Sequence, residues 1–326
     1  MTFRDYLQLF RAQTAPATIL LILTPYLTNA TLFSLETATI FIFALLIHWV
    51  SFGHNSLMDT AMGYDLKDPS KSHHPLVSGR ITLTAAHNVV HWSFCGLAVF
   101  AILLSLMFSP NPLYAVIAIF LWWVFGYAYN SGLSKESLLS FLPISICFTA
   151  MGAWGWFLSH NSLNTVGWLL LAYFFMTILF QISWSGHLKE LQMKERSNIL
   201  VKMGAKVEKG MFEPSYSMIY GGVVKFINVP ILGSLLLWAN FDFTRLIWLV
   251  VIILGTSHFL FRLIKPRQYI REKELRNMSL MEILTIYFPI PLMLPWLEAT
   301  VLMLFGVAYF WAMNKLLWGV ASHPRV

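Results

Sequence analysis

The stretch FGHNSLMDTAMGYDLKDPSKSHHPLVSGRIT, residues 52–82, is a highly polar connection in a strongly apolar chain, and the predicted fold is organised around it. Only 11% of the whole protein is charged, yet this one segment holds three carboxylates and several potential cations. The acidic residues are Asp59, Asp65 and Asp68, and the basic ones include Lys71, His73, His74 and Arg80. Grouped carboxylates repel one another unless a cation lies between them, and Mg²⁺ prefers oxygen ligands together with substrate phosphates. The segment therefore predicts a magnesium and phosphate site, and the alternative is a connection that is merely charged.

The spacing within this stretch predicts how its polar side chains come together. Asn55 and Asp59 are four residues apart, so they lie on one face if the preceding helix continues through both. Gly63 can adopt backbone conformations that end a helix, which would let Asp65 and Asp68 fold back toward that face.

The composition indicates a membrane protein. Of the 326 residues, 57% are hydrophobic and 16% are aromatic, and the mean hydropathy is +0.65. A soluble domain has about 45–50% apolar and about 25% charged residues. We therefore expect an all-α polytopic membrane protein, a single domain over residues 1–326, with a central apolar cavity capped by polar loops. Cys95 and Cys147 lie in apolar runs and indicate no disulfide framework, and we recognise no removable signal peptide.

Apolar stretches of about 20 residues are the unit of a membrane-spanning helix. We predict nine spans, and eight or ten also fit: 15–33, 37–54, 87–108, 112–130, 138–158, 164–185, 216–239, 245–264 and 283–318. The last stretch contains Pro289, Pro291 and Pro295, which predict a bend or an interfacial first segment.

The distribution of Lys and Arg predicts the orientation of these spans. With the N-terminus inside, 18 of the 22 basic residues fall in the N-terminal segment or in connections on the same side. This bias is typical of cytoplasmic loops. We therefore expect an integral protein of the cell (plasma) membrane, with a cytoplasmic N-terminus and cytoplasmic active-site loops. The net charge of +7 then reflects topology and attraction to anionic lipid or substrate, and we expect no nucleic-acid partner.

A second acidic patch, SGHLKELQMKERSNILVKMG at residues 185–204, follows the sixth span on the same side. Its carboxylates, Glu190 and Glu195, alternate with Lys189 and other bases, a pattern that also fits a solvated loop face. Patches four spans apart suggest two similar halves, 11–135 and 138–276, around one cavity.

Several single charges have alternative roles. Arg11, at the start of the first span, either anchors the helix at the interface or faces the cavity and binds an anion. Lys135, the only cation of YAYNSGLSKES at residues 127–137, is either a topology signal or a phosphate contact. Lys225 and Glu298 are charges inside predicted spans, and the sequence assigns them no role.

The first polar stretch resembles a known family. Its pattern Asn55-x3-Asp59-x3-Gly63-x-Asp65, followed by His-Pro-Leu-x-Ser-Gly-Arg-Ile at 74–81, is similar to the first aspartate-rich motif of the UbiA superfamily of intramembrane prenyltransferases. The Gly-x-Asp form looks most similar to members that prenylate 1,4-dihydroxy-2-naphthoate in menaquinone (quinone) synthesis. The Thr-x-Pro-Ala of residues 14–17 is similar to the start of those members.

Two other segments complete the resemblance. Tyr129-Asn130 with Lys135 is similar to the short loop after the fourth helix of the family. Lys189-Glu190 and the later Glu195 stand where the family has aspartates, and Ser56 stands where members often carry Asp.

The resemblance implies Mg²⁺-dependent transfer of a polyprenyl group from a prenyl diphosphate to a lipophilic acceptor, either an aromatic quinone precursor or a glycerol-type lipid. By the same resemblance, the catalytic residues are Asn55, Asp59, Asp65 and Lys135. The metal ligands are Asn55, Asp59, Asp65, Asp68, Glu190 and Glu195. The diphosphate ligands are Arg11, Lys71, His74, Arg80, Lys135 and Lys189.

Other functions fit the same sequence. A UbiA-type terpene cyclase would capture its carbocation internally, and an inactive member of the family would serve as a scaffold. A membrane transporter of an anionic solute would use the loops as a charged vestibule. Transporter sites usually lie near the middle of the membrane, whereas these polar residues gather at one face, which favours the enzyme.

Overall fold

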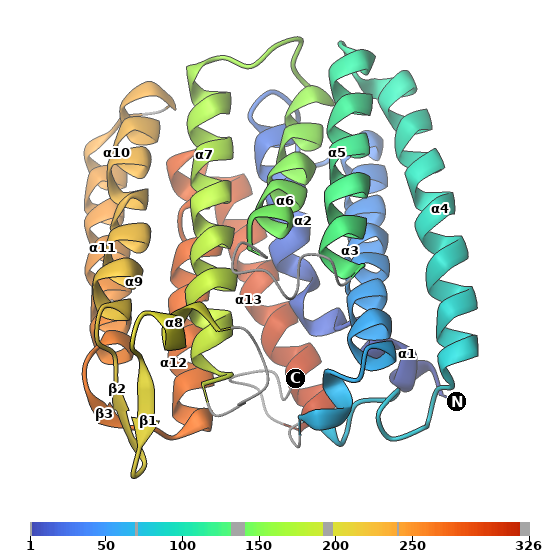
Figure 1. Ribbon diagram of the computed structural model, residues 1–326. Helices are drawn as coiled ribbons and strands as arrows, with labels where there is room; N and C mark the ends of the chain where they lie inside the picture. The colour runs from blue at the N-terminus through green and yellow to red at the C-terminus, as the bar shows by residue number, and fades with distance from the viewer. Residues whose placement is uncertain (1, 69–70, 132–140, 192–197, 240, 320–326) are drawn as a thin grey trace.

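Long helices running roughly side by side form the protein, with a small β-sheet at one end (Figure 1). The computed structural model describes residues 2–68, 71–131, 141–191, 198–239 and 241–319. Helices suit an apolar chain in lipid because each one satisfies its own backbone N–H and C=O groups.

The helices follow one another with short connections at one end of the bundle and longer polar connections at the other. Their bounds are α1 Phe3–Leu9, α2 Ala15–Leu27, α3 Leu35–Ala61, α4 Leu83–Phe108, α5 Pro112–Asn130, α6 Phe141–Phe157, α7 Thr165–Phe180, α8 Ile199–Lys202, α9 Ser217–Phe226, α10 Asn228–Ala239, α11 Phe243–Ile264, α12 Arg271–Ile286 and α13 Trp296–Trp318. Short turns precede or extend some of them: η1 Ala12–Thr14, η2 Asp65–Lys67, the π-helical η4 Gln181–Gly186 and η5 Ile290–Leu292.

Polar caps at the ends of apolar runs fix where several helices begin. The Ser34 hydroxyl accepts a hydrogen bond from the Thr37 N–H at 3.1 Å, and Thr82 and Asp242 cap α4 and α11 in the same way. Each cap satisfies a backbone donor that the first helical turn leaves without a partner.

The structure confirms the predicted polytopic membrane fold. In the part of the chain that it describes, seven helices are long and apolar enough to cross a membrane, and 12–27 and 141–157 are shorter apolar helices. The sequence did not predict α12, because its first half is polar and the ninth span was expected to start at residue 283.

The last predicted span is divided. The chain turns through Pro289, Pro291 and Pro295 between α12 and α13. The end of α13 then meets α1, where Gln8 Nε2 and Arg4 Nη2 donate to the Leu317 carbonyl oxygen at 2.8 Å and 2.9 Å. The first and last helices therefore meet at one end of the bundle, which we call the polar end.

A small three-stranded antiparallel sheet at the polar end is an addition to the predicted all-α fold (Figure 1). Its strands, β1 Lys206–Glu208, β2 Met211–Glu213 and β3 Arg267–Gln268, pair in the order β1-β2-β3. Lys209 and Gly210 both have positive φ, as a two-residue hairpin turn requires. The sheet ties the connection after α8 to the connection between α11 and α12.

Helix α2 lies at the centre of the bundle. Twelve of its thirteen residues are buried, and it packs against α3, α6 and α13. Its contact with α6 is close because Gly155 has no side chain. A Cβ at that position would lie 2.1 Å from the Ile22 carbonyl oxygen.

We predict that Gly155→Ala destabilises the bundle. The added methyl group meets backbone rather than a flexible side chain, so α2 and α6 must separate, at a cost of about 1–3 kcal/mol. Thermal unfolding in detergent should show a clearly lower Tm. Gly96→Ala in exposed α4, where a Cβ meets nothing within 4 Å, is the matched control. Equal Tm values for the two variants would contradict this account of the packing.

Candidate active site at the polar end of the bundle

Loops that are far apart in sequence gather at the polar end. Tyr269 Oη donates to the Leu188 carbonyl oxygen at 3.0 Å, and Arg271 reaches Asp68 across the site. Lys71 interacts electrostatically with Arg11, Lys189 and Asp59. The first polar stretch, the start of α2 and the connection after α7 therefore share one electrostatic environment.

The end of α3 carries the first two predicted ligands. The helix continues to Ala61, so Asn55 and Asp59 lie on one face as expected. Asn55 Nδ2 donates to Asn130 Oδ1 at 3.0 Å, and Asn130 Nδ2 lies 3.0 Å from His54 Nδ1. The end of α5 therefore fixes the orientation of the Asn55 amide.

Asp65 lies just after the turn that ends α3. Gly63 has φ +81°, which releases the chain from the helix, and Asp65 begins the turn η2. Its Oδ1 lies 3.9 Å from Lys71 Nζ. Its Oδ2 is buried and has no hydrogen-bond partner among the described residues. A buried carboxylate oxygen without a donor is costly, so this atom marks a position where a cation would be stabilised.

Lys71 and His74 are buried beside these carboxylates. Burial, followed by the charge of Arg11, lowers the pKa of Lys71 to about 7 against the attraction of Asp65. Burial and the charge of Lys71 lower the pKa of His74 to about 2, so its ring is neutral. Buried cations beside buried carboxylates suit a polyvalent anion that binds together with a metal ion.

Asp68 contacts a residue that the sequence did not single out. Arg271, at the start of α12, donates from Nη1 and Nη2 to its two carboxylate oxygens, both at 3.4 Å. These bonds are long, so the pair is weakly held. Each carboxylate oxygen of Asp68 keeps a further lone pair that can bind a metal ion.

Arg80 binds the N-terminal helix in this structure. Its Nη1 lies 2.5 Å from Asp5 Oδ1, and its Nη2 donates to Gln8 Oε1 at 2.9 Å and to the His73 carbonyl oxygen at 2.6 Å. This network docks α1 against the first polar stretch. Its role as a diphosphate ligand stays a prediction.

Arg11 has an unusual backbone conformation. Its φ of 48° and ψ of 45° lie in the left-handed region, which costs a non-glycine residue about 1–2 kcal/mol. His48 Nε2 lies 3.3 Å from the Arg11 carbonyl oxygen, and Thr14 Oγ1 donates to the same oxygen at 2.9 Å. The guanidinium carbon lies 5.9 Å from the ring centroid of Phe52, and the side chain lines a cavity.

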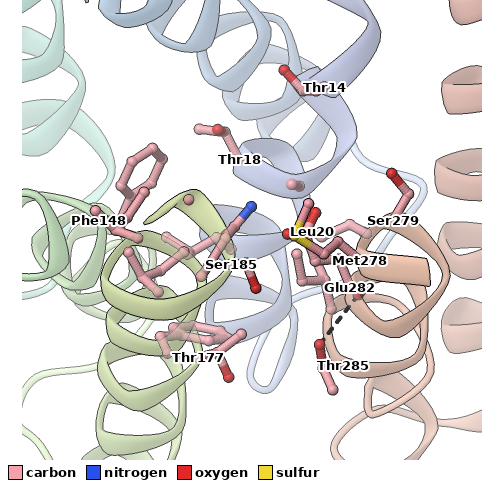
Figure 2. A pocket seen from close by; sticks show the side chains of 18 of the residues that line it. Thr14, Thr18, Leu20, Phe148, Thr177, Ser185, Met278, Ser279, Glu282 and Thr285 are labelled. Atoms are coloured by element: carbon pink, nitrogen blue, oxygen red, sulfur yellow. Dashed lines mark hydrogen bonds between the residues drawn. The ribbon is translucent and has the colours of Figure 1, made fainter. Parts of the chain in front are cut away.

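That cavity, of about 250 Å³, extends from the polar end into the bundle. Arg11 and Lys189 line it, together with apolar residues that include Leu20, Phe148 and Ile178. Figure 2 shows its walls, with Thr14 and Thr18 on one side, Thr177 and Ser185 on α7 and η4, and Met278 and Glu282 on α12. A cationic mouth opening into an apolar chamber suits an amphiphile with an anionic head.

The predicted second acidic motif is only partly described. Glu190 is half-buried after η4, beside the cavity residue Lys189. Lys135 and Glu195 lie outside the described residues. Within the described ranges, no three His, Cys, Asp or Glu side chains group closely enough to hold a metal ion by themselves.

The residues present still fit Mg²⁺. This ion is usually held by one or two carboxylates, and it completes its octahedral shell with water and substrate phosphate. Asp59 and Asp65 supply buried carboxylate oxygens as metal ligands. No N–H or O–H group among the described residues donates a hydrogen bond to Asp65 Oδ2. The donor set therefore matches an ion that binds together with its substrate.

Comparison with known proteins gives a family match. Residues 15–286 match the model of the UbiA prenyltransferase family, which is most of the chain. A search of curated proteins found no match.

Solved structures share the fold. A UbiA homologue from Archaeoglobus fulgidus bound to GPP and Mg²⁺ aligns with a TM-score of 0.63 at 14% identity, over 94% of this chain and 99% of that one. The same homologue bound to DMAPP and Mg²⁺ aligns with a TM-score of 0.63 at 15% identity and the same coverage. A structure described for digeranylgeranylglyceryl phosphate synthase aligns at 0.61 and 15%, over 88% and 98% of the two chains.

We predict that Asp5→Asn loosens the docking of α1 in a pH-dependent way. Burial alone would raise the pKa of Asp5, but hydrogen bonds from Thr2 and the charge of Arg80 outweigh it and lower the pKa. The pair therefore stabilises the fold above the unfolded-state pKa of about 3.9, and its contribution is lost as pH falls through the lowered folded-state value.

Thermal unfolding in detergent between pH 7 and pH 3 tests this prediction. The variant should have a Tm a few degrees below wild type at pH 7, because a partly exposed pair contributes about 1 kcal/mol. The Tm difference between wild type and variant should shrink toward pH 3, because protonation of Asp5 removes the same negative charge that the substitution removes. A difference that stays constant across the range would contradict the role of the carboxylate charge.

Proposed function

The chain belongs to the UbiA prenyltransferase family, and from this we propose that it transfers a polyprenyl group from a prenyl diphosphate to a lipophilic acceptor at the polar end of its cavity. The observation that carries the proposal is the buried Asp65 Oδ2 atom, which has no donor among the described residues and lies in a group of cations beside the cavity mouth. Prenyl diphosphates and Mg²⁺ bound to structural relatives support it.

We propose that Asp59 and Asp65, with the amide oxygen of Asn55, hold one Mg²⁺. Asp68, which contacts Arg271 in this structure, is a further ligand of the same ion. Glu190 and Glu195 bind a second Mg²⁺ in this proposal. When bound, Mg²⁺ neutralises charge on the diphosphate oxygens and makes the diphosphate a better leaving group.

The cations at the mouth bind the diphosphate head. Arg11 and Lys189 line the cavity, and the buried Lys71 interacts electrostatically with both of them and with Asp59 and Asp65. We propose that Lys135 and Arg80 also bind the diphosphate, and that His74 contributes as a neutral hydrogen-bonding ligand. Preorganised cations stabilise the negative charge that develops on the leaving group, which is usually the largest contribution to catalysis.

The apolar part of the cavity holds the prenyl tail and the reacting carbon. The C1–O bond breaks, and its electron pair leaves with the diphosphate. The allylic cation then forms a bond with the acceptor, which loses the proton from the attacked carbon or hydroxyl, and the released diphosphate takes up that proton. Phe52, Phe148 and Phe174 line this space, and aromatic ring faces stabilise a nearby cation. Exclusion of water prevents hydrolysis of the cation.

Several finer assignments belong to the same proposal. The protein is an integral membrane protein by its helices, and we propose the plasma membrane, with the polar end cytoplasmic. We also propose that residues 1–326 form one domain with two similar halves, 11–135 and 138–276. A quinone precursor such as 1,4-dihydroxy-2-naphthoate and a glycerol-type lipid are the two acceptor classes.

The alternatives make different demands on the same site. A terpene cyclase would release diphosphate and yield a cyclic hydrocarbon or alcohol without any acceptor. A carrier of anionic solutes would need no carboxylate-bound metal, whereas buried Asp59 and Asp65 at the mouth favour a metal-dependent enzyme.

We predict that Asp59→Asn abolishes Mg²⁺-dependent turnover in a folded protein. Loss of one carboxylate should lower diphosphate release from geranylgeranyl diphosphate by about 100-fold or more, because the charge of the leaving group is no longer balanced. Diphosphate release by purified protein measures this, with products identified by mass spectrometry in the presence and absence of a membrane lipid extract.

Glu298→Gln, at the end of the bundle away from the polar end, is the matched control and should keep wild-type turnover. Chelation of Mg²⁺ should reduce wild type to the level of Asp59→Asn. Unaltered turnover in Asp59→Asn would contradict the proposed site. Release that does not need the lipid extract, with a cyclic product, would favour the cyclase.

A further inference from the structure

Two ionisable residues inside the bundle have no part in the chemistry described so far. Glu282 lies on α12 and Lys225 on α9, and both are far in sequence from the aspartate motif. Buried charges within membrane helices are costly, so they usually mark a substrate or ion site.

The two residues form part of one polar cluster. Lys225 is buried, its Nζ lies 4.6 Å from the ring centroid of Phe180, and it interacts electrostatically with Glu282. Gln181, at the start of the π-helical turn η4, lies close enough to Glu282 to interact with its carboxylate. Three helices thus converge on the Glu282 carboxylate.

The cluster lies deeper in the bundle than the cationic mouth. Gln181 precedes Lys189 by eight residues, and Glu282 follows Arg271, at the polar end, by eleven. At about 1.5 Å per helical residue, both spacings place Glu282 roughly 12–16 Å from the polar end. Its carboxylate also interacts electrostatically with Lys189, so the cluster adjoins the diphosphate site from within the cavity.

Glu282 faces the cavity. Its side chain is partly exposed and lines the cavity (Figure 2). Two buried polar side chains line the same space without a hydrogen-bond partner in the described part of the chain. They are Ser185, through its Oγ, and Gln13, through both amide atoms. Buried polar atoms left unpaired in this way indicate a ligand that would pair with them.

We propose that Glu282, with Ser185 and Gln13, is the subsite for the polar group of the acceptor, and that this group is a hydroxyl on an apolar body. The proposal rests on the proposed transferase function and names its acceptor class. A carboxylate accepts hydrogen bonds and donates none when ionised, so it recognises O–H donors.

Charge separates this subsite from the donor site. Arg11 and Lys189 at the mouth attract the diphosphate, whereas Glu282 repels a second anion placed deep in the cavity. Lys225 interacts electrostatically with Glu282 and offsets its negative charge. The Glu282 carboxylate oxygens can then accept a hydrogen bond from a ligand. An anionic substituent on the acceptor must therefore point away from Glu282, toward the mouth.

A matched pair of probes tests the proposal without turnover. 1-Naphthol and 1-methoxynaphthalene share an apolar body and differ in the O–H donor. Equilibrium binding to the purified wild-type protein in detergent, corrected for partition into empty micelles, should favour 1-naphthol by about tenfold. The double variant Glu282→Met/Lys225→Met removes the carboxylate together with its balancing charge, so it should bind the two probes within about twofold of each other.

The controls separate this proposal from protein stability and from the donor site. Glu272→Gln, on the exposed first turn of α12, should keep the wild-type preference. Tm values identify a variant that fails to fold, and Glu282→Gln, which keeps shape but not charge, then replaces the double variant and should weaken the preference. Equal binding of the two probes by wild type, no binding of either probe, or a preference that persists without Glu282 would overturn the proposal. Mg²⁺-dependent binding of geranylgeranyl diphosphate reports on the transferase function separately, because it depends on Asp59 and should survive the loss of Glu282.

Discussion

Charges buried among apolar helices need compensating charges, and the polar end of this protein is arranged by that requirement. Asp65 faces Lys71 at 3.9 Å, Asp68 faces Arg271 at 3.4 Å, and Asp5 faces Arg80 at 2.5 Å. The last two pairs join segments that are far apart in sequence, so charge compensation also sets the tertiary arrangement of the loops. The compensation is incomplete at Asp65, whose second carboxylate oxygen has no hydrogen-bond donor among the described residues. A bound cation would stabilise this buried oxygen.

The local features of the site could be predicted because they depend on short-range geometry. The four-residue spacing of Asn55 and Asp59 puts them on one helical face, and Gly63 takes the positive φ that ends the helix. The membrane fold follows from the lengths of the apolar runs, and the match to the UbiA prenyltransferase family confirms the resemblance based on those motifs.

Long-range partners could not be predicted, because nothing in a uniformly apolar helix shows which side faces the cavity. Arg271 is about 200 residues from Asp68 in sequence, and Arg80 was predicted to bind diphosphate, whereas its partner in the structure is Asp5. Glu282 was placed just outside the last predicted span, so it did not register as a charge within the bundle. The sheet was missed because its strands are only two or three residues long and its β3 strand comes from a distant connection.

The arrangement of the cavity favours a fixed order of contacts along its axis. In the proposed reaction, the cations at the mouth bind the diphosphate beside Asp59 and Asp65, which places the reacting carbon at the polar end. Apolar and aromatic walls then take up the prenyl tail, and the polar residues on α12 and η4 offer hydrogen bonds that a tail cannot use. Unpaired polar atoms in an otherwise apolar wall reduce affinity for a purely hydrocarbon ligand. A chamber built only to hold a prenyl chain would not need them, and this is the structural reason to look for a second, hydroxyl-bearing substrate in the same space.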